Sequence, residues 1–170
     1  TYLNVKPVTI TYLEMTSPAS LSPKPAPDGL SLSECRVRQY PLNRFLYQFI
    51  GGPWHWTDNL PWSDDEWKTY VERDDLRTWI AWCDGAVAGY YELERQADGN
   101  VEIAYFGLAQ DFIGRGFGGY LLTRAIESAW EWDGTRRVWV HTCTLDHPSA
   151  LNNYLSRGMQ IYKKEIEEPN

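Results

Sequence analysis

The sequence predicts a single α/β domain with a mixed, largely antiparallel central sheet flanked by helices. Two Asp-Gly pairs, at 84–85 and 98–99, separate three runs of strand-forming residues, which is the pattern of an antiparallel meander. A glycine-rich loop after the meander opens into a helical pattern that leads to a further strand, as in a sheet covered by helices. The length of 170 residues suits one ordinary domain with one core, so we expect a single domain over residues 1–170.

The first predicted elements are two strands joined by a linker. Residues 8–15 alternate β-branched and polar side chains, which predicts a strand, and residues 32–37 are predicted to form a second, shorter one. The segment 17–29 between them is rich in Pro and Ser. We therefore expect it to be an exposed excursion of the chain.

Two helices are predicted next. Residues 41–50 carry apolar side chains at helical spacing, with Pro41 in the first turn and a glycine pair at 51–52 to end the helix. Ser63 is a predicted N-cap, and the three acidic residues that follow it suit the first turn of a helix running through residue 71.

Five strands and two helices are predicted in the second half of the chain. The predicted strands cover residues 77–83, 86–93, 101–108, 138–143 and 159–164, and the predicted helices cover residues 118–132 and 148–157. The first three of these strands form the meander, and Gly158 ends the last helix. The sequence shows no internal repeat.

The composition disfavours several classes of function. The formal net charge of -7 argues against nucleic acid as a partner and suits a cationic acceptor better. Three cysteines, odd in number and far apart, fit neither a disulfide framework nor a Cys-x-x-Cys metal site, which indicates a reducing compartment. No apolar stretch approaches the roughly 18 residues of a membrane span, and no basic, apolar leader is found, so we expect a cytoplasmic protein without a membrane partner. An exposed strand or tryptophan-rich face could form a homodimer.

The stretch 112–122 organises the chain because it holds four glycines and an arginine directly before a helical pattern. Glycines let the backbone approach a ligand closely, and the unpaired N–H groups of the following helix favour phosphate. The run Gly114-x-Gly116-x-x-Gly119 matches the dinucleotide fingerprint by letter, so an NAD-binding oxidoreductase is a remote alternative. That fingerprint needs a doubly wound parallel sheet, and the remaining residues are too few for its second half.

The wider pattern resembles the GCN5-related N-acetyltransferase (GNAT) superfamily. The order is strand, loop with x-x-Gly-x-Gly, helix, strand, and then Ala150-x-x-x-Tyr154-x-x-x-Gly158. The resemblance is strong over residues 86–162, and the N-terminal half matches only in the order of its elements. It implies the acyl-CoA N-acyltransferase fold, with acceptor-side elements over residues 1–75 and a cofactor-binding core over residues 77–165.

The resemblance also implies an activity. Members of the superfamily transfer an acetyl group from acetyl-CoA directly to a primary amine, here of a small molecule or a lysine, and we expect no metal. A non-catalytic coenzyme A binding module of the same fold is the alternative.

The resemblance assigns the loop and the end of the preceding strand to coenzyme A. Ile113 stands where Gln or Arg is usual, so we expect the backbone contact to remain and one side-chain phosphate contact to be lost. Arg115 is a candidate cation for the phosphates. His147 stands where Asn is frequent, and we expect it to contact the cofactor or to cap the next helix. The residues assigned to the cofactor are Phe106, Gly107, Leu108, Ile113, Gly114, Arg115, Gly116, Phe117, Gly118, Gly119 and His147.

Two catalytic residues follow from the same resemblance. Amine acetylation needs a base for the amine and an acid for the departing thiolate. Glu102 lies eleven residues before Ile113, at the place of the general base in the histone-acetylating branch, and strand alternation predicts that Glu102, Ala104 and Phe106 share one face. Tyr154 lies at the place of the tyrosine that protonates the thiolate. The alternatives are a solvent-facing carboxylate for Glu102 and a packed helix residue for Tyr154.

The acceptor is expected to meet a segment rich in tryptophan and acidic residues. Trp54 and Trp56 are the predicted substrate-binding residues because aromatic faces near carboxylates attract ammonium groups, and a core role is the alternative. His141 and Cys143 share a strand face, and we expect a packed pair there. His55 has no second ligand at metal spacing.

Overall fold

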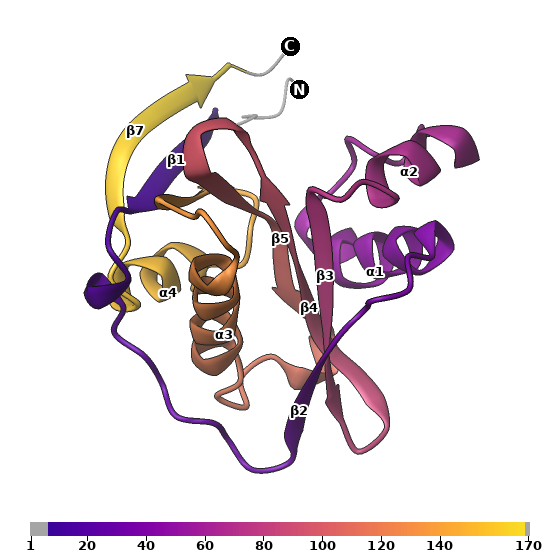
Figure 1. Cartoon of the computed structure of the whole chain (residues 1–170), viewed down its shortest axis with the longest axis horizontal. Helices are drawn as coiled ribbons and strands as arrows, with labels where there is room; N and C mark the ends of the chain where they lie inside the picture. Colours follow the sequence, from indigo (N-terminus) through magenta and orange to yellow (C-terminus); the bar gives the residue numbers. More distant parts are fainter. Residues whose placement is uncertain (1–6, 169–170) are drawn as a thin grey trace, which may run out of the picture.

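A computed structural model describes residues 7–168 of the chain. Within this part, seven strands form one mixed sheet in the order β2-β3-β4-β5-β6-β1-β7 (Figure 1). The strands are β1 (Val8–Met15), β2 (Leu30–Glu34), β3 (Leu76–Cys83), β4 (Ala86–Arg95), β5 (Asn100–Leu108), β6 (Arg137–Cys143) and β7 (Gln160–Glu167). The α-helices are α1 (Tyr40–Gly51), α2 (Asp64–Val71), α3 (Gly118–Glu131) and α4 (Ala150–Ser156).

The sheet confirms the predicted fold class. Strands β3, β4 and β5 form the expected antiparallel meander, and β5 with β6 is the one parallel pair among the described strands. A single parallel pair is not the doubly wound sheet that the dinucleotide fingerprint requires. The literal glycine match therefore lacks the structural setting of an NAD site.

The helices cover both faces of the sheet. Helices α1 and α2 lie on one face, and α3 and α4 lie on the other (Figure 1). The main core lies under α3, whose buried face follows helical spacing. A second, smaller core joins α1, α2 and the start of β3. The buried residues of α3 are Leu121, Leu122, Thr123, Ala125, Ile126, Ser128 and Ala129.

Several predicted element boundaries shift in the structure. The second strand covers Leu30–Glu34 and not 32–37, because its pairing with β3 ends at Glu34 opposite Trp79. The last helix begins at Ala150 and not at residue 148. The predicted cap of α2 is confirmed, since the Ser63 hydroxyl accepts from the N–H of Glu66 while the Glu66 carboxylate accepts from the N–H of Ser63.

The segment between the first two strands crosses one face of the molecule. Strand β1 pairs with both β6 and β7, whereas β2 lies at the opposite edge of the sheet. The connecting residues 16–29, here called the strap, therefore run past α4 and α3 (Figure 1). The strap is mostly exposed, as predicted, but it is bonded to both helices: the N–H of Ser22 donates to Arg157 O at 2.8 Å, and that of Lys24 donates to Thr123 Oγ1 at 3.0 Å.

Candidate active site

The sheet splits between β5 and β6, and a cavity of about 910 Å³ opens there. The two strands pair only where Asn100 to Glu102 lie opposite Arg137 to Trp139. Beyond Glu102, the edge of β5 that faces β6 has no strand partner among residues 7–168. Backbone N–H and C=O groups along this edge are therefore free to bind an extended ligand.

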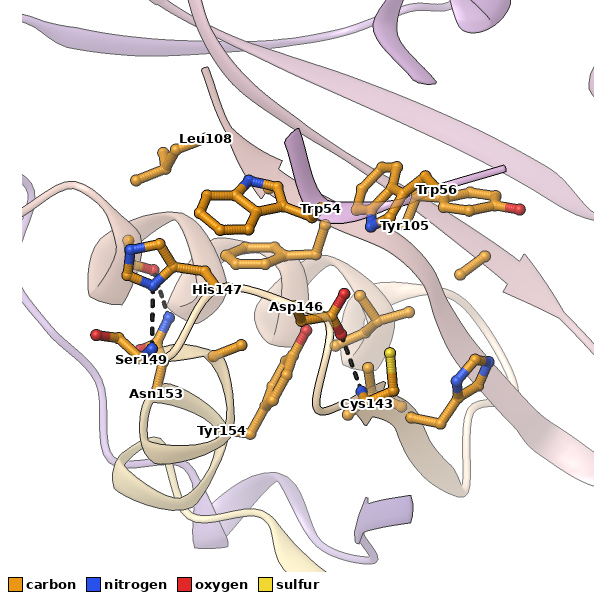
Figure 2. Close-up of a pocket in the computed structure, with 18 of the residues that line it drawn as sticks. Trp54, Trp56, Tyr105, Leu108, Cys143, Asp146, His147, Ser149, Asn153 and Tyr154 are labelled. Atoms are coloured by element: carbon orange, nitrogen blue, oxygen red, sulfur yellow. Dashed lines mark hydrogen bonds between the residues drawn. The ribbon is translucent and has the colours of Figure 1, made fainter. Parts of the chain in front are cut away.

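The cavity brings together the residues that the sequence assigned to the site, with one exception. Its lining includes Trp54, Trp56, Glu102, Phe106, Gly107, Leu108, Ile113, Gly114, Gly116, Phe117, Gly118, Gly119, His147 and Tyr154. Figure 2 shows Trp54, Trp56 and Tyr105 along one wall and Asp146, His147 and Tyr154 along the other. The exception is Arg115, whose guanidinium carbon lies over the rings of Phe112 and Phe117, at 5.1 and 5.2 Å from their centroids.

A β-bulge in β5 sets the orientation of the residues around the split. Ile103 lies opposite Leu93 on β4, and Tyr105 lies opposite the preceding residue, Glu92, so Ala104 is an extra residue. An insertion of this kind shifts the alternation of the strand by one position and increases its local twist. The stronger twist helps β5 to diverge from β6.

The bulge corrects the prediction that Glu102, Ala104 and Phe106 share one face. Glu102 lies opposite Glu94, and the Glu94 carboxylate forms an ion pair with Arg73, which follows α2. Glu102 therefore lies on the face of the sheet that α1 and α2 cover. Phe106 instead packs against Tyr154 of α4, with 6.2 Å between the ring centroids. The prediction was wrong because the alternation of side chains between the two faces holds only for a strand without a bulge. Glu102 nevertheless lines the same cavity as the end of β5.

The Glu102 carboxylate is largely buried and is hydrogen-bonded at one end of the cavity. Its side chain is 14% exposed, and Gln96 Nε2 donates to it at 3.0 Å. Gln96 is itself positioned by Trp139, whose Nε1 donates to Gln96 Oε1 at 3.0 Å. Burial, reinforced by the charge of Glu94, raises the pKa of Glu102 to about 7, against the opposing effect of the Gln96 hydrogen bond. A carboxylate with this pKa can accept a proton near neutral pH.

Tyr154 rises from α4 with its hydroxyl directed into the cavity (Figure 2). Burial raises the pKa of Tyr154 above its usual range, and the charge of Asp146 adds to the shift. Asp146 is fixed beside it, because its carboxylate accepts hydrogen bonds from the N–H of Cys143 at 3.0 Å and from the hydroxyl of Thr142. A phenol with a raised pKa stays protonated at neutral pH, so Tyr154 is able to donate a proton.

The glycine loop lies at the other end of the cavity. Gly114 and Gly116 have φ values of +83° and +82°, a conformation that strains any residue with a Cβ. The loop delivers the chain to Gly118, the first residue of α3, and Asn153 Nδ2 of α4 donates to Gly118 O at 3.1 Å. The first N–H groups of α3 have no partner within the helix, and this end of the helix lines the cavity. Such an end favours an anionic ligand.

The two predicted substrate tryptophans have different surroundings. Trp54 meets His147 edge to face across the cavity, with 5.0 Å between the ring centroids (Figure 2). His147 also braces the turn before α4, since its Nδ1 accepts from the N–H of Ser149, the residue that precedes the helix, at 3.0 Å; it does not cap the helix itself. Trp56 is instead wedged between Tyr47 and Tyr105, at centroid distances of 5.7 and 5.3 Å. Trp56 therefore has a packing role as well as a cavity face, whereas Trp54 is freer to contact a ligand.

Apart from Asp146, which lies beside Tyr154, the charged side chains that line the cavity fall into two groups. Three carboxylates, those of Asp58, Glu94 and Glu102, gather around the start of β5. Two cations, Lys24 and Arg157, line the cavity beside α3 instead. Leu108, which lies beside Gly118 of α3, is six positions beyond Glu102 on β5, which corresponds to roughly 20 Å of strand. The two groups of charges therefore occupy opposite ends of the cavity.

Sequence reasoning missed several lining residues. The main ones are Lys24, Tyr105, Asp146, Asn153 and Arg157. Lys24 lies in a segment that was predicted to be an exposed linker, and Arg157 lies at a helix end where a cation is ordinarily solvated. Asp58 was not missed, because it belongs to the acidic segment around Trp54 that the sequence assigns to the acceptor, and it lines the cavity.

The remaining histidine and cysteine candidates do not form a nucleophile pair. His141 and Cys143 both line the cavity, but burial lowers the pKa of the imidazole and raises that of the thiol. His141 Nε2 lies 3.7 Å from the nearer Glu102 oxygen. In the part of the chain that the structure describes, no group of three or more His, Cys, Asp or Glu side chains is placed to hold a metal ion. No helix over residues 7–168 is long and apolar enough to cross a membrane.

Solved structures with this architecture include several acetyltransferases. A GCN5-related N-acetyltransferase from Kribbella flavida matches with a TM-score of 0.64 and 19% identity, over 98% of this chain and 59% of that one. One from Sphaerobacter thermophilus matches with a TM-score of 0.71 and 17% identity, over 95% of this chain and 51% of that one. An aminoglycoside acetyltransferase from an uncultured soil metagenomic sample, in complex with trehalose, matches with a TM-score of 0.61 and 15% identity, over 76% of this chain and 88% of that one.

The first two structures are much longer than this chain, which spans between half and three fifths of their length. No curated protein matches the sequence. The model of the acetyltransferase (GNAT) family matches residues 42–159, which include the split strands, the glycine loop and α4. This match covers more than half of the chain, and the chain therefore belongs to the GNAT family of acetyltransferases.

Proposed function

We propose that this protein is an acetyl-CoA-dependent N-acetyltransferase that acetylates a primary amine by direct transfer. The observation that carries the proposal is the layout of one cavity. Glu102, with its pKa raised to about 7, stands at one end, the glycine loop and the start of α3 stand at the other, and the open edge of β5 joins them. A base, an unpaired strand edge and an anion site in a row suit this reaction.

The residues present fit coenzyme A. Its phosphates suit the N–H groups at the start of α3, which Gly114 and Gly116 leave accessible. The amide groups of its extended pantetheine arm suit the free edge of β5 along residues 106–108. When bound, acetyl-CoA supplies the acetyl thioester. Ile113 contributes its backbone to the loop, and its apolar side chain supplies no phosphate contact.

Glu102 is the proposed general base. A primary amine is protonated at neutral pH and must lose a proton before it can attack a carbonyl carbon. The raised pKa of Glu102 matches that task, and Gln96 holds the carboxylate in place. His141 lies beside it, and burial lowers the pKa of this imidazole, so the acceptor end does not gain a competing positive charge at neutral pH.

Tyr154 is the proposed general acid. Its hydroxyl enters the cavity between the split strands and the start of α3, and burial keeps it protonated. The hydroxyl can donate a proton to a departing thiolate. Since a thiol of pKa near 8.5 is already a fair leaving group, the contribution of Tyr154 is modest, roughly tenfold to a hundredfold.

The acceptor end suits a molecule with more than one amino group. Asp58, Glu94 and Glu102 line it, and Trp54 offers an aromatic face at its border. One structural neighbour is an aminoglycoside acetyltransferase, which indicates that this fold can accept a polycationic amine. We propose a polyamine-like small molecule, with the lysine of a protein as the alternative acceptor.

The test is product formation on a panel of amines. The panel holds a monoamine, a linear polyamine, an aminoglycoside and a lysine peptide, each incubated with acetyl-CoA and analysed by mass spectrometry. Glu102→Gln is expected to slow turnover by a factor of roughly 10² while leaving the affinity for coenzyme A unchanged. The matched control is Glu167→Gln, an exposed carboxylate on β7. Binding of coenzyme A without product from any amine would instead indicate a non-catalytic binding module.

A further inference from the structure

Arg157 is a buried cation without an anion. It caps the C-terminal end of α4, is 7% exposed, and its Nε has no hydrogen-bond partner. Among residues 7–168, no carboxylate lies within ion-pair distance of its guanidinium. Burying a charge without compensation is unfavourable, and its side chain lines the cavity. These observations point to an anionic ligand.

A second cation converges on the same place. A Cβ on Gly119 of α3 would lie 2.5 Å from Arg157 Nη1 and 2.7 Å from Lys24 Cδ. Both side chains therefore lie over the first turn of α3, where unpaired N–H groups also favour negative charge. The absence of a side chain at Gly119 leaves the room that they occupy.

The strap holds Lys24 at this position through its own contacts. The N–H of Lys24 donates to Thr123 Oγ1 of α3, and the N–H of Ser22 donates to the carbonyl of Arg157 itself. The carbonyl oxygen of Ser20 lies only 2.1 Å from where a Cβ on Gly158 would be, so the strap packs directly on the end of α4. The strap lies outside the span that matches the family, which begins at residue 42.

We propose that Lys24 and Arg157 together bind the diphosphate of coenzyme A. The proposal rests on the proposed function, because it takes coenzyme A as the ligand. Arg157 offers a planar, multidentate donor, Lys24 offers a compact charge, and the N–H groups of α3 complete the site. Lys24 and Arg157 supply the side-chain contact to phosphate that the apolar side chain of Ile113 cannot make. It also explains how a protein of net charge -7 holds an anionic substrate.

The test is binding of coenzyme A and of 3′-dephospho-coenzyme A by isothermal titration calorimetry at two salt concentrations. The variants are Lys24→Gln and Arg157→Met, and Lys164→Gln on β7 is the control that removes one exposed positive charge elsewhere. Since the charge-assisted hydrogen bonds to a phosphate are lost, we expect affinity to fall about fivefold for Lys24→Gln and more than tenfold for Arg157→Met. Both variants are expected to lose part of the salt dependence of binding.

Thermal unfolding separates ligand binding from a structural role. Arg157→Met is expected to leave the Tm of the ligand-free protein unchanged or raised, because it removes an uncompensated buried charge, and to reduce the stabilisation that coenzyme A provides. A lower Tm without a change in affinity would show a packing role and overturn the proposal for Arg157. Lys24→Gln tests the pair without disturbing a buried position.

Comparing coenzyme A with 3′-dephospho-coenzyme A shows whether the two cations contact the diphosphate or the 3′-phosphate. Equal losses with coenzyme A and 3′-dephospho-coenzyme A are expected for a diphosphate site. A loss confined to coenzyme A would show that the pair contacts the 3′-phosphate and would overturn the assignment. If the wild-type protein binds and acetylates normally while both variants bind as tightly as it does, this proposal fails and the proposed function stands. If the wild-type protein binds no coenzyme A, both fail.

Discussion

Replacing Glu94 by Gln is expected to shift the pH dependence of turnover, because Glu94 is the charge that raises the pKa of Glu102 beyond the effect of burial. The two residues lie directly opposite each other on β4 and β5, so their carboxylates are roughly 6 Å apart. At that distance two unit charges interact by about 0.7 kcal/mol in bulk water and by about 3 kcal/mol at an effective dielectric constant of 20. Because Arg73 pairs with Glu94 and offsets part of its charge, we expect a net effect of roughly 1 kcal/mol, which corresponds to about 0.7 pH units.

Turnover should respond in a defined direction. Glu102 works as a base only when deprotonated, so kcat rises with pH through its pKa, with a midpoint near pH 7 in the wild type. Removing the like charge in Glu94→Gln favours the carboxylate form and moves the midpoint down by roughly half to one pH unit. The assay is kcat against pH at saturating amine and acetyl-CoA.

A matched variant isolates the electrostatic effect. Asp75→Asn removes an exposed carboxylate that forms an ion pair with Arg95, and it should leave the midpoint unchanged. A wild-type midpoint near pH 4.5, or a midpoint that is the same in Glu94→Gln as in the wild type, would refute the assignment of Glu102 as the titrating base.

Four further predictions concern stability and the site. Burial raises the pKa of Glu92 to about 7, above its value in the unfolded chain, so the folded protein keeps this proton to a higher pH. The free energy of unfolding should therefore fall by roughly 2–3 kcal/mol between pH 4.5 and pH 7. In urea titrations, the free energy of unfolding of Glu92→Gln should depend less on pH than that of the wild type. Tyr154→Phe should lower kcat roughly tenfold to a hundredfold and leave calorimetric affinity for coenzyme A unchanged. Trp56→Ala should destabilise the protein by roughly 2–3 kcal/mol in urea titrations, whereas Trp54→Ala should cost about 1 kcal/mol or less and raise the KM for amine. Gly116→Ala, at φ +82°, should cost about 1–2 kcal/mol and weaken coenzyme A binding; an unchanged affinity would argue against a loop that contacts the cofactor.

Most of the fold was predictable because its signals are local. The Asp-Gly turns, the N-cap at Ser63 and the apolar spacing of α3 each act over a few residues, and each appears in the structure where the sequence placed it. Boundaries moved where a partner strand decided them. The second strand is the clearest case, since its pairing with β3 ends at Glu34.

The parts of the site that sequence reasoning missed depend on contacts between distant segments. The bulge at Ala104 has no local signal, yet it separates Glu102 from Phe106 onto opposite faces. Arg157 has the appearance of an ordinary C-terminal helix cation. The strap packs over the end of α4 and α3 lies against the guanidinium, and no pattern within these segments indicates those contacts.

The role of Glu102 in acetyl transfer is tested by the mass of the product formed from acetyl-CoA and a linear polyamine by the wild-type protein and by Glu102→Gln. We expect a gain of one acetyl group on a nitrogen with the wild type and turnover reduced by a factor of roughly 10² with the variant, while both proteins bind coenzyme A equally. Equal turnover by the two proteins would contradict this expectation, and so would the absence of acetylated amine from a wild-type protein that binds acetyl-CoA.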